Sequence, residues 1–132
     1  MFLLDTNIVS DLVKNPGGRA ASRMAGIGDR SVTTNVIVAG EIRFGLLKKG
    51  SASLTERVEA VLRGIEILPL PPEVAATYGA IRLSLRSRGL PIGENDLWIA
   101  AQAQHLGAVL VTDNEREFRR VEGLAVENWL AA

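Results

Sequence analysis

The stretch that decides the fold is AVLVTDN, residues Ala108–Asn114. Its first four residues form a continuous apolar run, which is typical of a central strand in a parallel sheet because both faces of such a strand are covered. Thr112 and Asp113 follow the run directly. The N-terminus repeats the arrangement in FLLD, residues Phe2–Asp5. We therefore expect two parallel strands whose carboxyl ends place acidic side chains at one edge of a sheet.

Short apolar runs alternate with helical periodicity in the rest of the chain. Further strands are predicted at Ser31–Thr34, Ile65–Leu70 and Leu124–Val126. The predicted helices run through Ile8–Leu12, Arg19–Ile27, Val36–Lys49, Ser53–Arg63, Pro72–Arg88 and from about Asp96 to Leu106. This alternation indicates the α/β class, with one domain over residues 1–132, a mainly parallel central sheet and helices on both faces.

The composition excludes several classes of protein. The 132 residues and 47% hydrophobic content suit one domain with its own core. The 15 basic and 15 acidic residues balance, so no overall charge favours nucleic acid. The absence of cysteine excludes disulfides and thiolate metal sites. Because no signal peptide or membrane span is recognisable, we expect a cytoplasmic protein without membrane contact.

Four acids lie at the boundaries of predicted elements: Asp5, Glu41, Asp96 and Asp113. In the Val36–Lys49 helix, Ile37, Glu41 and Phe44 recur at three- and four-residue spacing and predict an inward stripe, which puts Glu41 beside the apolar face. Clustered carboxylates repel one another, and burial adds a desolvation cost. A Mg²⁺ or Mn²⁺ ion, which prefers oxygen ligands, removes both costs. The reaction class indicated is metal-dependent hydrolysis of phosphodiesters.

Each acid taken alone also has a structural explanation. Asp5 suits a helix N-cap, Asp96 suits the positive end of a helix dipole, and Asp113 suits a turn. Glu41 is harder to explain in this way, because Glu is seldom buried without a partner.

Other ionisable residues admit simpler interpretations. His105, the only histidine, is interpreted as structural at the end of its helix. Arg82, Arg86 and Arg88 indicate either a solvated helix face or a surface that binds RNA phosphates.

Four segments together resemble the PIN-domain ribonucleases, and the VapC-type toxins of bacterial toxin–antitoxin pairs in particular. They occur in order over nearly the whole chain: LLDTN at Leu3–Asn7, AGEIRFG at Ala39–Gly45, NDLWIAA at Asn95–Ala101, and LVTDN at Leu110–Asn114 with Glu117-Phe118. The closing VENW at Val126–Trp129 adds to the likeness.

The resemblance implies a three-layer α/β/α sandwich that binds Mg²⁺ or Mn²⁺ and cleaves RNA, such as tRNA or rRNA, to inhibit translation. Asp5, Glu41 and Asp96 match the acidic triad of the family. Asp5 and Asp96 would hold the metal, with Glu41 as a further ligand or as the group that positions water. The fourth position falls on Asp113 or Asn114. Asn7 and Thr112, with Asn114, would give polar support.

The resemblance also implies partners, namely a homodimer mate and a VapB-like antitoxin that blocks the acidic pocket. We expect the antitoxin to lie along the Val36–Lys49 and Ser53–Arg63 helices. Two alternatives stay open from the residues: another acidic metal-dependent nuclease that acts on DNA, and a catalytically silent PIN-fold protein that binds RNA or regulates.

Overall fold

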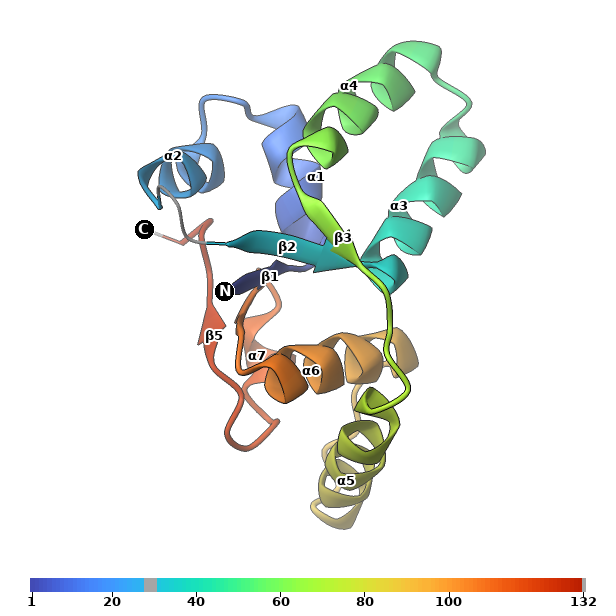
Figure 1. The fold of residues 1–132 in the computed structure, drawn as a ribbon, viewed down its shortest axis with the longest axis vertical. Coiled ribbons are helices and arrows are strands. Elements are labelled where there is room, and N and C mark those ends of the chain that lie inside the picture. The colour runs from blue at the N-terminus through green and yellow to red at the C-terminus, as the bar shows by residue number, and fades with distance from the viewer. Residues whose placement is uncertain (28–30, 132) are drawn as a thin grey trace.

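The computed structural model describes residues 1–27 and 31–131, and its centre is a five-stranded parallel sheet (Figure 1). The strands lie in the order β3-β2-β1-β4-β5. Their bounds are β1 (Phe2–Leu4), β2 (Val32–Asn35), β3 (Glu66–Leu68), β4 (Val109–Val111) and β5 (Val126–Glu127). All four neighbouring pairs are parallel. The α/β class and the predicted parallel sheet are therefore confirmed.

The two strands that the sequence singled out are adjacent at the centre. Leu4 of β1 pairs with Val111 of β4. Since both strands run in the same direction, the residues that follow them, Asp5 and Thr112, lie next to each other at the carboxyl end of the sheet. This register brings the acid after one strand to the hydroxyl after the other.

Helices cover both faces of the sheet, as the right-handed crossover of parallel strands requires. Figure 1 shows α1, α3 and α4 on one face and the paired α5 and α6 on the other. The helices are α1 (Thr6–Lys14), α2 (Arg19–Gly26), α3 (Val36–Lys49), α4 (Ala52–Arg63), α5 (Val74–Ser87), α6 (Glu94–Leu106) and the short α7 (Glu115–Phe118). The layers form the α/β/α sandwich that the resemblance implied.

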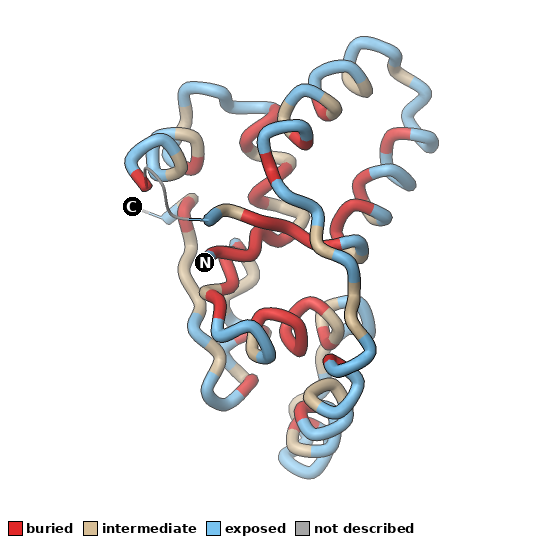
Figure 2. Tube along the Cα trace, viewed as in Figure 1, coloured by how far each residue is buried: buried red, intermediate tan, exposed pale blue. Residues whose placement is uncertain are grey.

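The core lies between these layers and includes nearly the whole length of the central strands (Figure 2). The three residues of β1 are fully buried, because helices cover both of its faces. One polar link crosses the core: Asn35 Nδ2 donates to Gln102 Oε1 (2.9 Å), and Gln102 Nε2 donates to the Pro69 carbonyl (2.8 Å). This link satisfies a buried amide pair and ties α6 to β2 and to the segment after β3.

One detail of the sequence prediction was wrong. The inward residues of α3 are Val38, Ile42 and Leu46, while Phe44 is 68% exposed. The predicted stripe was offset because α3 is apolar on nearly every side, so its periodicity could not select a face. Glu41 precedes buried Ile42 and is partly buried at the edge of the inward face.

Helix α7 was not predicted. A single turn carries little periodicity, and its one buried side chain is Phe118. No helix within the described ranges is long and apolar enough to cross a membrane.

Candidate active site

Asp5 lies where β1 ends and α1 begins. Its Oδ1 accepts the backbone N–H of Thr6 (2.8 Å), and its Oδ2 accepts the hydroxyl of Thr112 (2.8 Å) and a longer contact from Asn7 Nδ2 (3.4 Å). The side chain is only 5% exposed. Burial raises the pKa of Asp5, its hydrogen bonds lower it, and the nearby charge of Glu41 raises it further. Asp5 is therefore both a helix cap and a buried carboxylate held in a fixed position.

Glu41 connects three helices. Its Oε2 accepts the hydroxyl of Thr6 (2.9 Å) at the start of α1, and its Oε1 accepts Nδ2 of Asn95 (3.3 Å) in the first turn of α6. The sequence placed Glu41 in the site but did not assign Thr6 or Asn95 to it. Each adjoins a predicted site acid in the chain, which is the signal that could have identified it.

Asp96 lies in the first turn of α6, where the helix dipole favours a carboxylate. Despite this, burial raises its pKa to about 6, with further contributions from the negative charges of Asp5, Glu117 and Glu41. No hydrogen bond to its carboxylate is present among residues 1–27 and 31–131. Asp96 is thus the acid of the cluster that lacks a protein partner to offset the repulsion.

Glu117 on α7 is the fourth carboxylate of the cluster, and its charge raises the pKa of Asp96. Asn114 holds it in position, since Nδ2 of Asn114 donates to Oε2 of Glu117 (2.7 Å). The backbone N–H of Asn114 is itself fixed by the hydroxyl of Thr112 (3.0 Å). Sequence reasoning did not assign Glu117 to the site, although its position three residues after Asn114 puts the two on one side of a helical turn.

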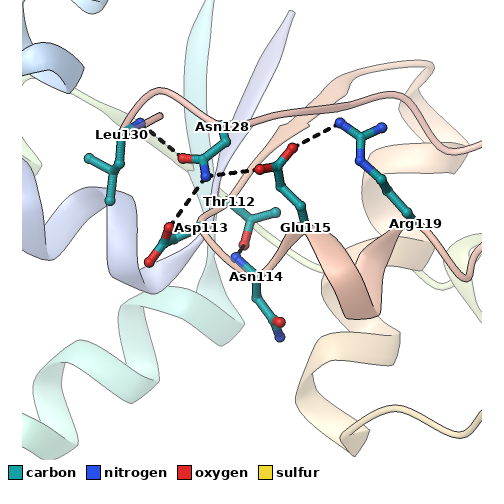
Figure 3. Close-up of polar contacts among 7 residues, drawn as sticks. All are labelled: Thr112, Asp113, Asn114, Glu115, Arg119, Asn128 and Leu130. Carbon is teal, nitrogen blue, oxygen red and sulfur yellow. Dashed lines mark hydrogen bonds and ion pairs between the residues drawn. The ribbon is translucent and has the colours of Figure 1, made fainter. Parts of the chain in front are cut away.

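The carboxylate of Asp113 contacts Asn128 of the C-terminal segment (Figure 3). Its Oδ1 accepts Nδ2 of Asn128 (3.3 Å), which also donates to Glu115 Oε2 (3.1 Å), and the Asp113 side chain is exposed. Its backbone N–H donates to Asn7 Oδ1 (3.0 Å). The structure therefore brings Asp5, Glu41 and Asp96 together and directs Asp113 toward the C-terminal segment. The predicted catalytic role of Asp113 stays a prediction.

The donor set suits a hard divalent cation. No three His, Cys, Asp or Glu side chains in the described part of the chain are already arranged around one ion position. However, Mg²⁺ typically takes only one or two protein carboxylates and keeps several waters. Asp5 and Asp96 provide two carboxylates with raised pKa values, and both values would fall beside a cation. The residues present therefore fit a two-carboxylate Mg²⁺ or Mn²⁺ site, with Glu41 as the predicted third ligand.

Comparison with known proteins identifies the family of the chain. The family described as PIN domain matches residues 2–124. Ribonuclease VapC2 of Haemophilus influenzae is 37% identical over 133 residues and 98% of each chain. The tRNA(fMet)-specific endonuclease VapC of Shigella flexneri is 33% identical over 97% of each chain. The crystal structure of VapBC2 from Rickettsia felis, bound to a DNA fragment from its promoter, contains a chain with a TM-score of 0.90 and 30% identity, covering 97% of this chain and 98% of that one.

Proposed function

Because the chain belongs to the PIN-domain family and, within it, to the VapC ribonucleases, we propose that it is a metal-dependent endoribonuclease that acts as the toxin of a toxin–antitoxin pair. The observation that carries the proposal is the environment of Asp96, whose pKa is raised to about 6 by burial and by the charges of Asp5, Glu117 and Glu41. Such a cluster of carboxylates is stabilised by a cation. A metal ion bound by carboxylates can activate water for the hydrolysis of a phosphodiester.

Each residue of the site has a proposed role in binding the metal or in positioning another group. Asp5 and Asp96 hold Mg²⁺ or Mn²⁺, which when bound lowers the pKa of water and stabilises negative charge on the phosphoryl group. Thr112 and the Thr6 N–H keep Asp5 in a single orientation. Glu41, fixed by Thr6 and Asn95, is the group that positions the attacking water or joins the ligands.

Beside the residues proposed to hold the metal and the water, Asn114 keeps Glu117 directed toward Asp96.

We also propose a cytoplasmic location, where RNA is available and a chain without cysteine needs no oxidising compartment.

We propose tRNA as the substrate class, because the Shigella flexneri relative is named a tRNA(fMet)-specific endonuclease. The test is incubation of the purified protein with a tRNA pool, an rRNA fragment and a single-stranded DNA, each with Mg²⁺, Mn²⁺ or chelator. Defined tRNA fragments that require metal and vanish in Asp5→Ala would support the proposal. Cleavage of the DNA alone would replace it with a deoxyribonuclease. Metal binding without cleavage of any of the three would leave a protein that only binds.

The proposed antitoxin site is a groove along α3 and α4. One hollow of about 590 Å³ lies between these helices and includes Leu46, Leu47 and Thr55. A second, of about 280 Å³, also includes Leu46 and continues to Thr6 and Glu41. Because Leu46 belongs to both, a peptide bound along the groove would end at the acidic site. This supports the expectation that the antitoxin both binds here and blocks the carboxylates.

The groove can be tested with two exposed leucines. Leu47, 84% exposed, lines the groove, whereas Leu83, 67% exposed, lies on α5 on the opposite face of the sheet. Leu47→Glu should weaken binding of the cognate antitoxin by at least tenfold, because it replaces an apolar contact with a carboxylate that loses its hydration on binding. Leu83→Glu should leave the affinity unchanged. Equal affinities for both variants would place the antitoxin elsewhere.

We also propose that the chain forms a homodimer, since Val36 and Phe44 leave apolar side chains on the outer face of α3 at 48% and 68% exposure. A monomeric mass in sedimentation analysis would exclude it.

A further inference from the structure

The three arginines of the α5 region differ in what they contact. Arg88 is engaged within the fold: its Nη2 donates to the Arg120 carbonyl (2.7 Å) and to Ser84 Oγ (3.3 Å), and Nε lies 3.7 Å from Glu122 Oε1. Arg82 and Arg86 form no ion pair with any described residue. Their positive charges are therefore available for an external anion.

Arg82 and Arg86 stand at a cavity of about 350 Å³ between α5 and α6. Its apolar walls are Leu85, Pro91, Ile92 and Leu97. Glu94 is the third charged residue of the lining, so two positive charges and one negative leave a net charge of +1. An apolar cavity with two guanidinium groups matches a nucleotide, whose base is flat and weakly polar and whose phosphate is anionic.

Arg82 is held in place before any ligand arrives. Its Nη1 donates to the hydroxyl of Tyr78 (3.0 Å), and its guanidinium carbon lies 6.0 Å from the centre of the same ring. Tyr78 in turn stacks on Trp98, with ring centres 3.8 Å apart and planes inclined by 15°. A guanidinium fixed in this way loses less conformational entropy on binding, which makes it an efficient phosphate contact.

The cavity and the acidic site share the first turn of α6. Glu94 faces the cavity, Asn95 donates to Glu41, and Asp96 belongs to the acid cluster. Positions two residues apart on a helix point to nearly opposite sides, and a helix with its side chains is about 10 Å across. The cavity and the acids therefore lie on different sides of the first turn of α6, close enough for one bound RNA strand to reach both.

We propose that this cavity binds one nucleotide of the RNA substrate, near the cleaved bond but not at it. Arg82 and Arg86 bind the phosphate of that nucleotide, and Pro91 and Ile92, the apolar residues of the lining that are not buried in the core, contact its base. The proposal rests on the proposed ribonuclease function and assigns to it a substrate-anchoring site that is separate from the carboxylates. These two arginines are positioning residues, since the reacting phosphate lies at the acids.

Direct binding tests the cavity without cleavage. The probe is a fluorescein-labelled oligouridylate, titrated by anisotropy in chelator, with its integrity checked on a gel. Arg82→Gln and Arg86→Gln should each weaken binding by about tenfold. Together they should make the slope of log affinity against log salt shallower by about 0.7, since both arginines bind one phosphate and each phosphate contact on a single strand contributes about 0.7. The matched control is Arg57→Gln on the opposite face of the sheet, an exposed arginine that makes no ion pair with a described residue.

The Arg57→Gln control shows whether a loss of affinity for the oligonucleotide is specific to the cavity. Unchanged affinity in the double variant would overturn the proposal, and so would an equal loss in Arg57→Gln, which would indicate diffuse attraction. A change in sedimenting mass in the double variant would show that a second copy of the chain occupies the cavity instead.

Kinetics separate this proposal from the proposed function. With Mg²⁺ and the RNA that the wild type cleaves, each variant should raise KM by about tenfold at constant kcat, as expected when binding is lost equally from ground and transition states. A fall in kcat at constant KM would overturn the anchoring role while leaving the ribonuclease intact. If the wild type cleaves no RNA, the ribonuclease proposal fails on that result alone, and the anisotropy series still decides whether the cavity binds nucleotides.

Discussion

Replacing Asp96 by Asn should stabilise the protein in the absence of divalent metal. In the folded chain, burial and the charges of Asp5, Glu117 and Glu41 oppose the ionised form of Asp96. Asparagine has nearly the same shape without the charge, so it removes the repulsion from the folded state. The same change should abolish the response to metal, because the proposed site loses one of its two best ligands.

The magnitude follows from the pKa. A rise from the ordinary value of 3.8 to about 6 corresponds to about 3 kcal/mol of opposition to the charged form. Asp96 is only half-buried, so solvent screening reduces this to roughly 2 kcal/mol. Asparagine also loses a favourable interaction with the α6 dipole, which costs about 0.5 kcal/mol. The net gain near pH 7.5 is therefore on the order of 1–2 kcal/mol, or a rise in Tm of about 4–6 °C for a chain of this size.

The sign of the pH dependence is fixed by the same shift. Since the folded pKa of Asp96 lies above the unfolded value, the cost is fully present above about pH 6 and is relieved as the pH falls toward 3.8. Wild type in chelator should therefore become more stable relative to Asp96→Asn between pH 7.5 and pH 5. The burial of Asp5, which also raises its pKa, acts in the same direction in both proteins.

The assay is urea unfolding in chelator at pH 7.5 and pH 5, with Asp113→Asn as the control. Asp113 is exposed and its carboxylate accepts from Asn128, so its replacement should not reproduce the gain. An Asp96→Asn protein that is no more stable than the wild type at pH 7.5 would refute the reasoning about the cluster.

Three other changes should have the following effects. Glu117→Gln should lower the affinity for Mn²⁺ by about tenfold in calorimetric titration, because the supporting charge beside Asp96 is lost; an unchanged affinity would remove Glu117 from the site. Gln102→Leu should reduce the free energy of unfolding by about 2–3 kcal/mol in urea, since Asn35 Nδ2 and the Pro69 carbonyl lose their partner; a neutral result would mean that water replaces the amide. Gly107→Ala should cost about 1 kcal/mol in the same assay, because Gly107 ends α6 at φ +64°, a conformation that a side chain disfavours.

The sequence predicted the parallel sheet and most of its helices because strand burial and helix periodicity are local signals. The run at Ala108–Val111 identified a central strand, and the acids that follow such strands identified the edge at which Asp5 would lie. Glu41 and Asp96 were likewise singled out by their places at the boundaries of predicted helices, the resemblance matched both to the family triad, and the structure brings both close to Asp5.

Side-chain direction was the information that the sequence lacked. Asp113 and Asn114 are neighbours after β4, yet one contacts Asn128 and the other contacts Glu117. Adjacent residues in a turn diverge by an angle that periodicity does not specify. The inward face of α3 was missed for a similar reason, because a helix that is apolar all round has no preferred side. Arg82 and Arg86 were distinguished from Arg88 only by their contacts in three dimensions.

The most direct test of the central claim is the single-turnover rate of tRNA cleavage in Mn²⁺ for wild type, Asp96→Asn and Asp113→Asn. The claim that the carboxylates of Asp5, Glu41 and Asp96 form the reactive centre predicts that Asp96→Asn loses at least about a hundredfold in rate. Asp113→Asn should remain within about twofold of wild type, because its carboxylate lies outside the repulsive cluster. Cleavage by Asp96→Asn at the wild-type rate, or cleavage that persists in chelator, would contradict the account.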